Sequence, residues 1–181
     1  AQAIDSFYIG KDGIKRPLGS IGHLATFSFH ETKNIISGEG GMLAINDMQF
    51  AKRAEIIWEK GTNRSSFFRG EVNKYGWVDI GSSFLPSEII SAFLWAQLEN
   101  IQDIQDRRKA IWNKYYFKLK SRIEKHGVRM PFLPNFASNN AHMFYFLAKD
   151  SKQRNEIIEF LKSLEIHAVF HYLSLHKSPF Y

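Results

Sequence analysis

The chain has 181 residues, 44% hydrophobic and 15% aromatic, an apolar content typical of a packed domain and not of a disordered segment. It has no cysteine, which excludes disulfide scaffolds and cysteine-based metal or nucleophile sites, and no run of 18 apolar residues that would span a membrane. The net charge of +6 raises nucleic-acid binding as a function. However, the basic residues gather between 107 and 125 opposite an apolar helical stripe, a pattern typical of a solvated helix face.

The first part of the chain is expected to begin with a hairpin. Residues 7–9 alternate and are followed by Lys11-Asp12-Gly13, a turn sequence that predicts antiparallel pairing across it. The chain starts without methionine and without a signal sequence, so we expect its natural N-terminus to lie further upstream.

A lysine between two short apolar runs is the strongest chemical feature. Residues 24–29 have strand character, Lys33 follows, and a glycine-rich turn at 38–41 leads into a second predicted strand, 42–45. Between buried strands an ammonium is desolvated, which favours the neutral amine that condenses with an aldehyde. Hydroxyl and backbone N–H groups at strand ends can bind phosphate. The pattern indicates a covalent aldehyde cofactor carrying a phosphate; the alternative is a surface hairpin with a solvated lysine.

Helices are expected over the next part of the chain. Asn46 or Asp47 can cap a helix over 48–60, which Gly61 ends. Residues 62–81 show no helical period, and such a long irregular stretch favours a functional or interface loop. A helix is predicted from Pro86, with Ser82 or Ser83 as its cap, to about residue 101.

The remaining pattern predicts a long helix over 104–126, ended by Gly127, and a linker to residue 140. A strand (142–148), a helix (151–164) and a strand (167–172) then predict an α+β unit. His167 and His171 share one face of that strand about 13 Å apart, and no carboxylate lies nearby in sequence. We therefore predict no metal site.

Three stretches together resemble one family. They are Ser28-Phe-His-x-x-Lys33-Asn34 followed by Gly-Glu-Gly-Gly; residues 53–64 with 75–83; and residues 140–145 with 168–172 and 175–176. The chain resembles, over essentially its whole length, the DegT/DnrJ/EryC1/StrS nucleotide-sugar aminotransferases, which are pyridoxal phosphate (PLP) enzymes. The resemblance implies an α/β fold of fold-type I, like that of aspartate aminotransferase. Residues 1–105 would be the C-terminal part of the PLP-binding large domain, and residues 106–181 a linking helix and an incomplete small α+β domain.

The resemblance also implies roles for cofactor-binding residues. Lys33 occupies the position that binds PLP covalently and moves the proton during catalysis. Ser28 occupies the position whose hydroxyl binds the cofactor phosphate, and Gln2 the position near its 3′ oxygen. Ser83 stands where many members carry the asparagine that reaches a neighbouring subunit's phosphate, so this chain departs from the family pattern there and offers a hydroxyl in place of an amide. The family's pyridine-nitrogen aspartate and first phosphate loop would precede Ala1, so this chain alone is not expected to bind PLP tightly.

Substrate contacts are implied in the same way. They fall on His30, Asn63, His171, Tyr172 and His176, although a purely structural role for His30 is equally compatible with the sequence. The stretches are most similar to members that transfer an amino group to the 4-keto carbon of dTDP-4-keto-6-deoxyglucose, and the resemblance implies glutamate as the amino donor. That reaction would serve cell-surface polysaccharides such as lipopolysaccharide or enterobacterial common antigen.

Alternatives remain within and beyond this class. A 3-keto-sugar transaminase would use the same Lys33 chemistry, and a non-catalytic binding module on the same fold would not need Lys33. A basic nucleic-acid-binding protein would show salt-sensitive DNA binding. We expect a cytoplasmic homodimer with no metal, nucleic-acid or membrane partner, in which the basic helix has at most a minor part in attracting the anionic nucleotide-sugar.

Overall fold

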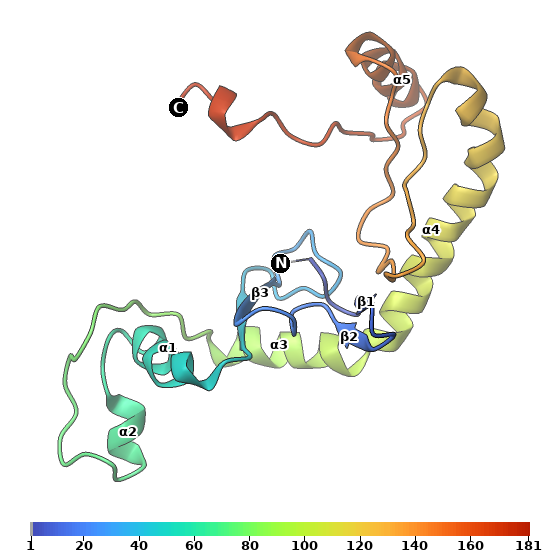
Figure 1. Ribbon diagram of the computed structural model, residues 1–181. Coiled ribbons are helices and arrows are strands. Elements are labelled where there is room, and N and C mark those ends of the chain that lie inside the picture. Colours follow the sequence, from blue (N-terminus) through green and yellow to red (C-terminus); the bar gives the residue numbers. More distant parts are fainter. Residues whose placement is uncertain (1) are drawn as a thin grey trace. The chain divides into compact units, whose positions relative to one another are not determined.

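The computed structural model describes residues 2–181 and divides the chain into two compact units. Unit 1 contains the chain up to Trp112 together with Leu133–Met143, and unit 2 contains Asn113–Phe132 and Phe144–Tyr181. Figure 1 shows the order of the elements along the chain, from the blue hairpins to the red C-terminal segment. The division of the parent fold between residues 105 and 106 stays a prediction.

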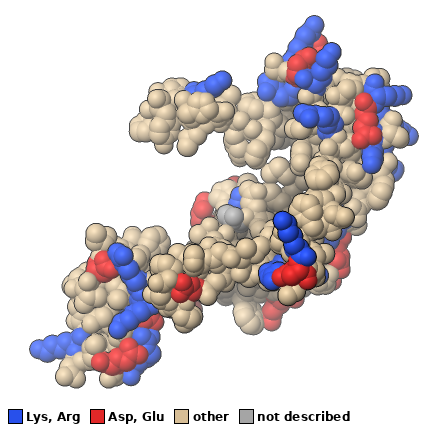
Figure 2. Space-filling model, in the orientation of Figure 1, with Lys and Arg blue, Asp and Glu red and all other residues tan. Residues whose placement is uncertain are grey.

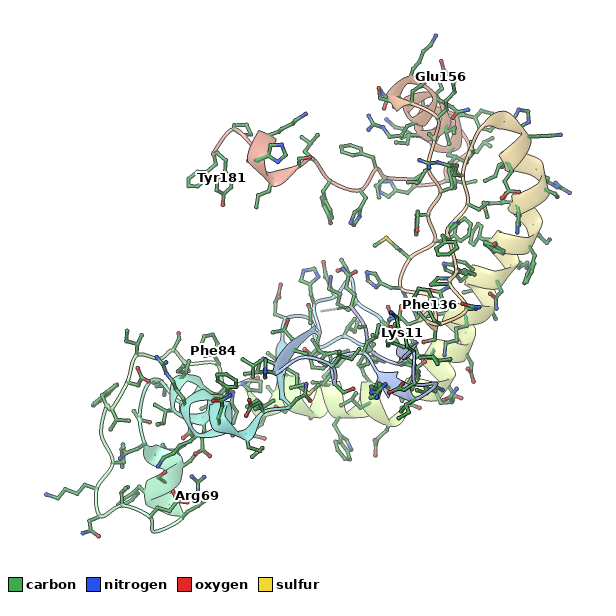
Figure 3. All side chains as sticks on the ribbon, viewed as in Figure 1. Lys11, Arg69, Phe84, Phe136, Glu156 and Tyr181 are labelled. Atoms are coloured by element: carbon green, nitrogen blue, oxygen red, sulfur yellow. The ribbon has the colours of Figure 1, made fainter. Side chains whose placement is uncertain are left out.

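Unit 1 begins with the predicted hairpin. Strand β1 (Phe7–Ile9) pairs antiparallel with β2 (Lys15–Pro17), and Tyr8 lies opposite Arg16. Asp12 stabilises the turn because its carboxylate accepts from the backbone N–H of Ile14 at 3.0 Å and binds the Arg16 guanidinium. These hydrogen bonds lower the pKa of Asp12 to about 2. Phe136, labelled in Figure 3, packs edge-to-face on Tyr8 with ring centres 5.9 Å apart.

The second hairpin carries the lysine loop. Strands β3 (Leu24–Ser28) and β4 (Gly41–Ile45) pair antiparallel with Leu24 opposite Ile45 and Ser28 opposite Gly41. The predicted strands are therefore confirmed, but their burial is not, because Leu24, Met42 and Leu43 are each more than 40% exposed. Within the described residues this sheet has two strands, so each strand is hydrogen-bonded to one neighbouring strand.

Two helices follow where one helix and a loop were expected. Asp47 caps a 3-10 helix, η1 (Met48–Phe50), which continues into α1 (Ala51–Trp58). The segment 62–81 was predicted to be irregular, and this is wrong for α2 (Arg64–Phe68). The reason is a cap from outside the helix: the Glu59 carboxylate, at the end of α1, accepts from the Ser65 backbone N–H at 3.1 Å and stabilises a helix that has no periodic signal of its own.

The next two helices adjoin each other in sequence. Helix α3 (Glu88–Glu99) begins two residues later than expected, because the Ser87 hydroxyl, not Ser82 or Ser83, accepts from the Ile90 N–H at 3.3 Å. Helix α4 (Ile101–Ile123) continues into the 3-10 helix η2 (Glu124–His126) and ends at Gly127, whose φ of +77° favours glycine. The predicted long helix is confirmed.

Unit 2 differs from its expected α+β pattern. Helix α5 (Ser151–Ser163) forms as predicted and is capped by Asp150, and a 3-10 helix, η3 (Leu175–Lys177), follows near the C-terminus. The strands predicted at 142–148 and 167–172 are wrong within the described residues: an isolated bridge pairs Arg129 with Leu147, and Tyr172 has a φ of +40°. Apolar alternation alone does not make a strand, because its hydrogen bonds need a partner strand.

The buried apolar side chains are few and lie mostly in unit 1. They are Phe29, Ile35, Trp112, Val128 and Ala141. No described helix is long and apolar enough to cross a bilayer. Figure 2 shows Lys and Arg interspersed with Asp and Glu over the visible face, which is typical of a solvated surface rather than of a continuous basic patch.

Candidate functional site

The two ends of the loop between β3 and β4 are joined by backbone hydrogen bonds. The Phe29 N–H donates to the Gly40 carbonyl at 2.8 Å, and the Glu31 N–H donates to the Gly38 carbonyl at 2.9 Å. Beyond these pairs the chain turns, with the Lys33 N–H donating to the His30 carbonyl at 2.9 Å. Lys33 is half-buried at this turn. The hairpin thus presents one lysine on a loop whose two ends are tied to each other.

The backbone of this loop requires glycine at position 40. Its φ is +155°, and a Cβ at this position would lie 2.6 Å from the Ser37 hydroxyl oxygen. That hydroxyl donates to the Glu39 carbonyl at 2.8 Å. A larger residue at 40 would therefore displace the buried Ser37 that supports the loop from inside.

Ser28 and His30 lie where the strand becomes the loop. Ser28 is the last residue of β3 and is half-buried; its hydroxyl accepts from the His30 N–H at 3.4 Å. The Thr32 N–H donates to His30 Nδ1 at 3.2 Å, so a neutral ring carries its proton on Nε2, which lies 3.5 Å from a Glu39 carboxylate oxygen. His30 therefore contacts the loop itself, in keeping with the structural role that the sequence left open.

Asn34, next to Lys33, is a residue whose importance the sequence did not reveal. It was interpreted as a possible turn cap, but it is 4% exposed and bonded to residues far along the chain. Its amide nitrogen donates to the Gln105 side-chain oxygen at 2.8 Å and to the Asn140 carbonyl at 2.7 Å. We call Asn34, Gln105 and Asn140 the amide cluster.

Gln2 is tied to the same cluster through its backbone. Asn140 Nδ2 donates to the Gln2 carbonyl at 2.6 Å and to the Ile4 carbonyl at 2.9 Å. The Gln2 side chain itself is exposed. The N-terminal segment and the lysine loop, which are both predicted to contact the cofactor, are therefore connected through Asn140.

A half-buried ion pair borders the amide cluster. Lys109 Nζ lies 2.6 Å from the Asp5 carboxylate, which also accepts from the Gln105 side-chain nitrogen at 3.2 Å. Burial by itself raises the pKa of Asp5, but the hydrogen bonds from Lys109 and Gln105 outweigh it, and the net pKa is lowered. Desolvation lowers the pKa of Arg108, which donates to the His142 carbonyl at 2.8 Å.

Asn63 and Ser83 belong to the segment that follows α1. Asn63 precedes α2, and its side-chain oxygen accepts from the Gly76 N–H at 2.8 Å, so it closes this segment on itself. Ser83 is exposed and forms an isolated bridge with Glu59. The structure assigns both residues a backbone-organising role, and their contacts with a partner subunit stay a prediction.

The remaining predicted substrate residues lie in unit 2. His171, Tyr172 and His176 are all exposed, and the rings of His171 and Tyr172 have centres 5.0 Å apart. His167 and His171 do not lie on a strand, so the 13 Å spacing predicted from a strand does not apply to them. Among residues 2–181, no group of three or more acidic or histidine side chains is arranged to hold a metal ion.

Known proteins resemble this chain along its whole length. The family model described as "DegT/DnrJ/EryC1/StrS aminotransferase family" matches residues 1–181. The spore coat polysaccharide biosynthesis protein SpsC of Bacillus subtilis is 29% identical over 92% of this chain and 44% of its own length. The dTDP-4-dehydro-2,3,6-trideoxy-D-glucose 4-aminotransferase of Saccharopolyspora spinosa is 27% identical over 90% of this chain and 43% of its own.

Solved structures show the same fold. DesV of S. venezuelae has a TM-score of 0.81 at 26% identity, over 100% of this chain and 44% of its own. The PMP form of Spr1654 from Streptococcus pneumoniae, described as a putative sugar aminotransferase, has a TM-score of 0.80 at 22% identity, over 97% of this chain and 44% of its own. The chain spans less than half the length of these relatives. The chain belongs to the DegT/DnrJ/EryC1/StrS aminotransferase family and has part of its PLP fold-type I architecture.

Proposed function

We propose that the protein containing this chain is a PLP-dependent aminotransferase that acts on a nucleotide-linked keto sugar. The observation that supports this most directly is the placement of Lys33. It is half-buried on a loop closed at its base by two strands, in a chain matched from end to end by an aminotransferase family. The surface-hairpin alternative is disfavoured because the residues on both sides of the loop, Phe29 and Ile35, are buried.

The groups available in unit 1 fit the chemistry of PLP. The primary amine of the half-buried Lys33 suits an aldehyde, and the Ser28 hydroxyl at the end of β3 suits a phosphate oxygen. Gln2 would supply a side-chain amide near the cofactor's 3′ oxygen, and Ser83 a further hydroxyl. When bound, PLP supplies an electron sink and a carbon that carries the amino group between substrates.

Lys33 itself would have two tasks. Its Nζ would hold the cofactor covalently in the resting enzyme. Once an amino donor, which we propose to be glutamate, has displaced it, the freed amine would take the proton from the donor's α-carbon and deliver it to the cofactor carbon. Hydrolysis by one water would release the donor as its keto acid, and the reverse sequence would return that water and place the amino group on the sugar.

We further propose that the acceptor is dTDP-4-keto-6-deoxyglucose, aminated at its 4-keto carbon for a cell-surface polysaccharide. One relative of this chain is itself named as a 4-aminotransferase of a dTDP-linked deoxy sugar. His30, Asn63, His171, Tyr172 and His176 would contact the sugar or its diphosphate. We expect a cytoplasmic homodimer in which Asn63 and Ser83 reach the partner's site.

The test is made on the protein at its native length, with PLP and then borohydride added, followed by peptide mass mapping. We expect a cofactor adduct on Lys33. Lys33→Arg keeps the positive charge but cannot condense with the aldehyde, so we expect no adduct and an amination rate lowered by at least about 10³-fold.

Lys11→Arg, in the β1–β2 turn, is the matched control and should label and turn over like the wild type. An adduct spread over surface lysines would overturn the catalytic proposal in favour of a binding module. If Lys33 is labelled, assaying the aminated enzyme with 4-keto and 3-keto sugars identifies the acceptor position.

A further inference from the structure

The amide cluster lies against the residue next to Lys33. Asn34 is 4% exposed and Gln105, on α4, is 1% exposed, so both amides are removed from water. A buried amide that lacks a partner costs free energy, and here the Asn34 side chain is bonded through both its nitrogen and its oxygen. These hydrogen bonds fix the lysine loop at Asn34, the residue that follows Lys33.

The orientation of the Asn34 amide follows from its partners. The Asn140 carbonyl can only accept, so the Asn34 atom 2.7 Å from it is the nitrogen. The other end of the amide is then the oxygen, which lies 2.9 Å from His142 Nδ1. An amide oxygen only accepts, so His142 carries a proton on Nδ1 and donates it to Asn34.

Asn140 extends the same connection to the N-terminal segment. Its backbone carbonyl accepts from Asn34 and, at 3.2 Å, from Gln105, while its side-chain nitrogen donates to the carbonyls of Gln2 and Ile4. One residue therefore binds both segments that the proposed function places around the cofactor. Neighbouring Ile35 is 1% exposed, so the loop also has a buried apolar side chain beside Asn34.

We propose that Asn34 is a positioning residue, whose buried amide fixes the backbone at Lys33 and, through Asn140, holds Lys33 and Gln2 in one rigid frame. This inference rests on the proposed function. Asn34 does not touch the reacting atoms; it acts by limiting the conformations that the Lys33 backbone adopts, so that its amine stays aligned with the cofactor aldehyde.

The test compares Asn34→Ala with Asn46→Ala in the protein at its native length. Asn46 is the control because its amide nitrogen, like that of Asn34, donates twice, here to the Gly19 and Gly22 carbonyls, both at 2.8 Å, at an exposed position without contact to the amide cluster. Two readouts apart from turnover are measured: the share of borohydride-trapped cofactor found on Lys33, and the rate at which untrapped cofactor dissociates.

For Asn34→Ala we expect dissociation to be about tenfold faster, with part of the label moved from Lys33 to other lysines, the size of effect that follows from losing a buried hydrogen bond. Asn46→Ala should stay within about twofold of the wild type in both readouts, because its hydrogen bonds are exposed and lie outside the amide cluster. Equal behaviour of the two variants would overturn the inference.

A gentler variant covers the case in which Asn34→Ala does not fold. His142→Phe keeps a ring but removes the donor to Asn34 Oδ1, and we expect a smaller change in the same direction, about threefold. No change in this variant would also contradict the inference. If the wild type itself shows no label on Lys33, it is the proposed function that fails, which separates the two results.

Discussion

At the scale of single residues, unit 1 combines buried amides with one partly buried ion pair. The Asp5 backbone has a φ of +54°, a conformation that aspartate tolerates better than most residues, and its carboxylate is bound by Lys109 and Gln105. The carboxylate thus joins the N-terminal segment to α4. Because its pKa is lowered in the folded chain, this contact makes folding depend on pH.

Lys109→Met tests this contact. Asp5 has a lowered pKa when folded, so its contribution is fully present above the ordinary aspartate pKa of about 3.9 and is lost as the pH falls through the folded value. At neutral pH we expect the variant to lose about 1 kcal/mol of unfolding free energy, since the pair is partly exposed.

The difference between the wild type and Lys109→Met should shrink toward zero as the solution is acidified below the folded pKa. Denaturant unfolding at a series of pH values measures it. Lys118→Met, further along α4, is the control and should lose less. A difference that is constant with pH would show that the contribution of Lys109 comes from packing and not from its charge.

At the scale of elements, α1 and α2 are joined by a carboxylate. Glu59, at the end of α1, is 7% exposed and accepts from both the N–H and the hydroxyl of Ser65 at the start of α2. Arg69, at the end of α2 and labelled in Figure 3, returns to α1 by binding the Glu55 carboxylate at 2.7 Å. The short α2 is therefore held at both ends by α1.

Glu59→Ala should destabilise α2 selectively. It leaves the Ser65 N–H without its acceptor, and we expect a cost of about 1–3 kcal/mol. Segment-resolved hydrogen exchange should show faster exchange over α2 with little change over α5. Glu59→Gln keeps a side-chain acceptor and should show a smaller effect; if it exchanges as fast as Glu59→Ala, the carboxylate charge, and not the hydrogen bond, stabilises the helix.

At the scale of the whole molecule, few of the side chains in residues 2–181 are fully buried, so each carries a large share of the packing. Ile35, on the lysine loop next to Asn34, is 1% exposed. Trp112 is 4% exposed, and its indole nitrogen donates to the Met143 carbonyl at 2.9 Å. Trp112 is the last residue of α4 that belongs to unit 1. The loop that carries Lys33 is thus part of the core of unit 1.

Ile35→Ala tests this dependence on one buried side chain. We expect a loss of about 2–5 kcal/mol in unfolding free energy, the usual cost of truncating a buried isoleucine. Ile14→Ala, at a 54% exposed position in the β1–β2 turn, should change it by less than about 0.5 kcal/mol. Denaturant unfolding measures both. Equal effects would contradict the assignment of Ile35 to the core.

The sequence by itself determined the elements whose signals are local. The β1–β2 turn, the stop of the long α4 helix at Gly127, both ends of α5, and the lysine between two short strands were all predictable, because turn residues, caps and helical hydrogen bonds involve neighbours within a few positions. The family also followed from local motifs, with Lys33, Ser28 and the glycine-rich turn in close succession.

Only the tertiary structure decided which residues support that lysine. Asn34 meets Gln105 and Asn140 across 71 and 106 positions of sequence, and a lone asparagine after a lysine carries no pattern that predicts such partners. The same reason explains the strands wrongly predicted near 145 and 170. Helix α2 was not predicted because its cap is the Glu59 side chain, which lies outside the helix and six residues before Ser65. Strand pairing and buried amide contacts are formed between distant segments, so they depend on the fold and not on the local sequence.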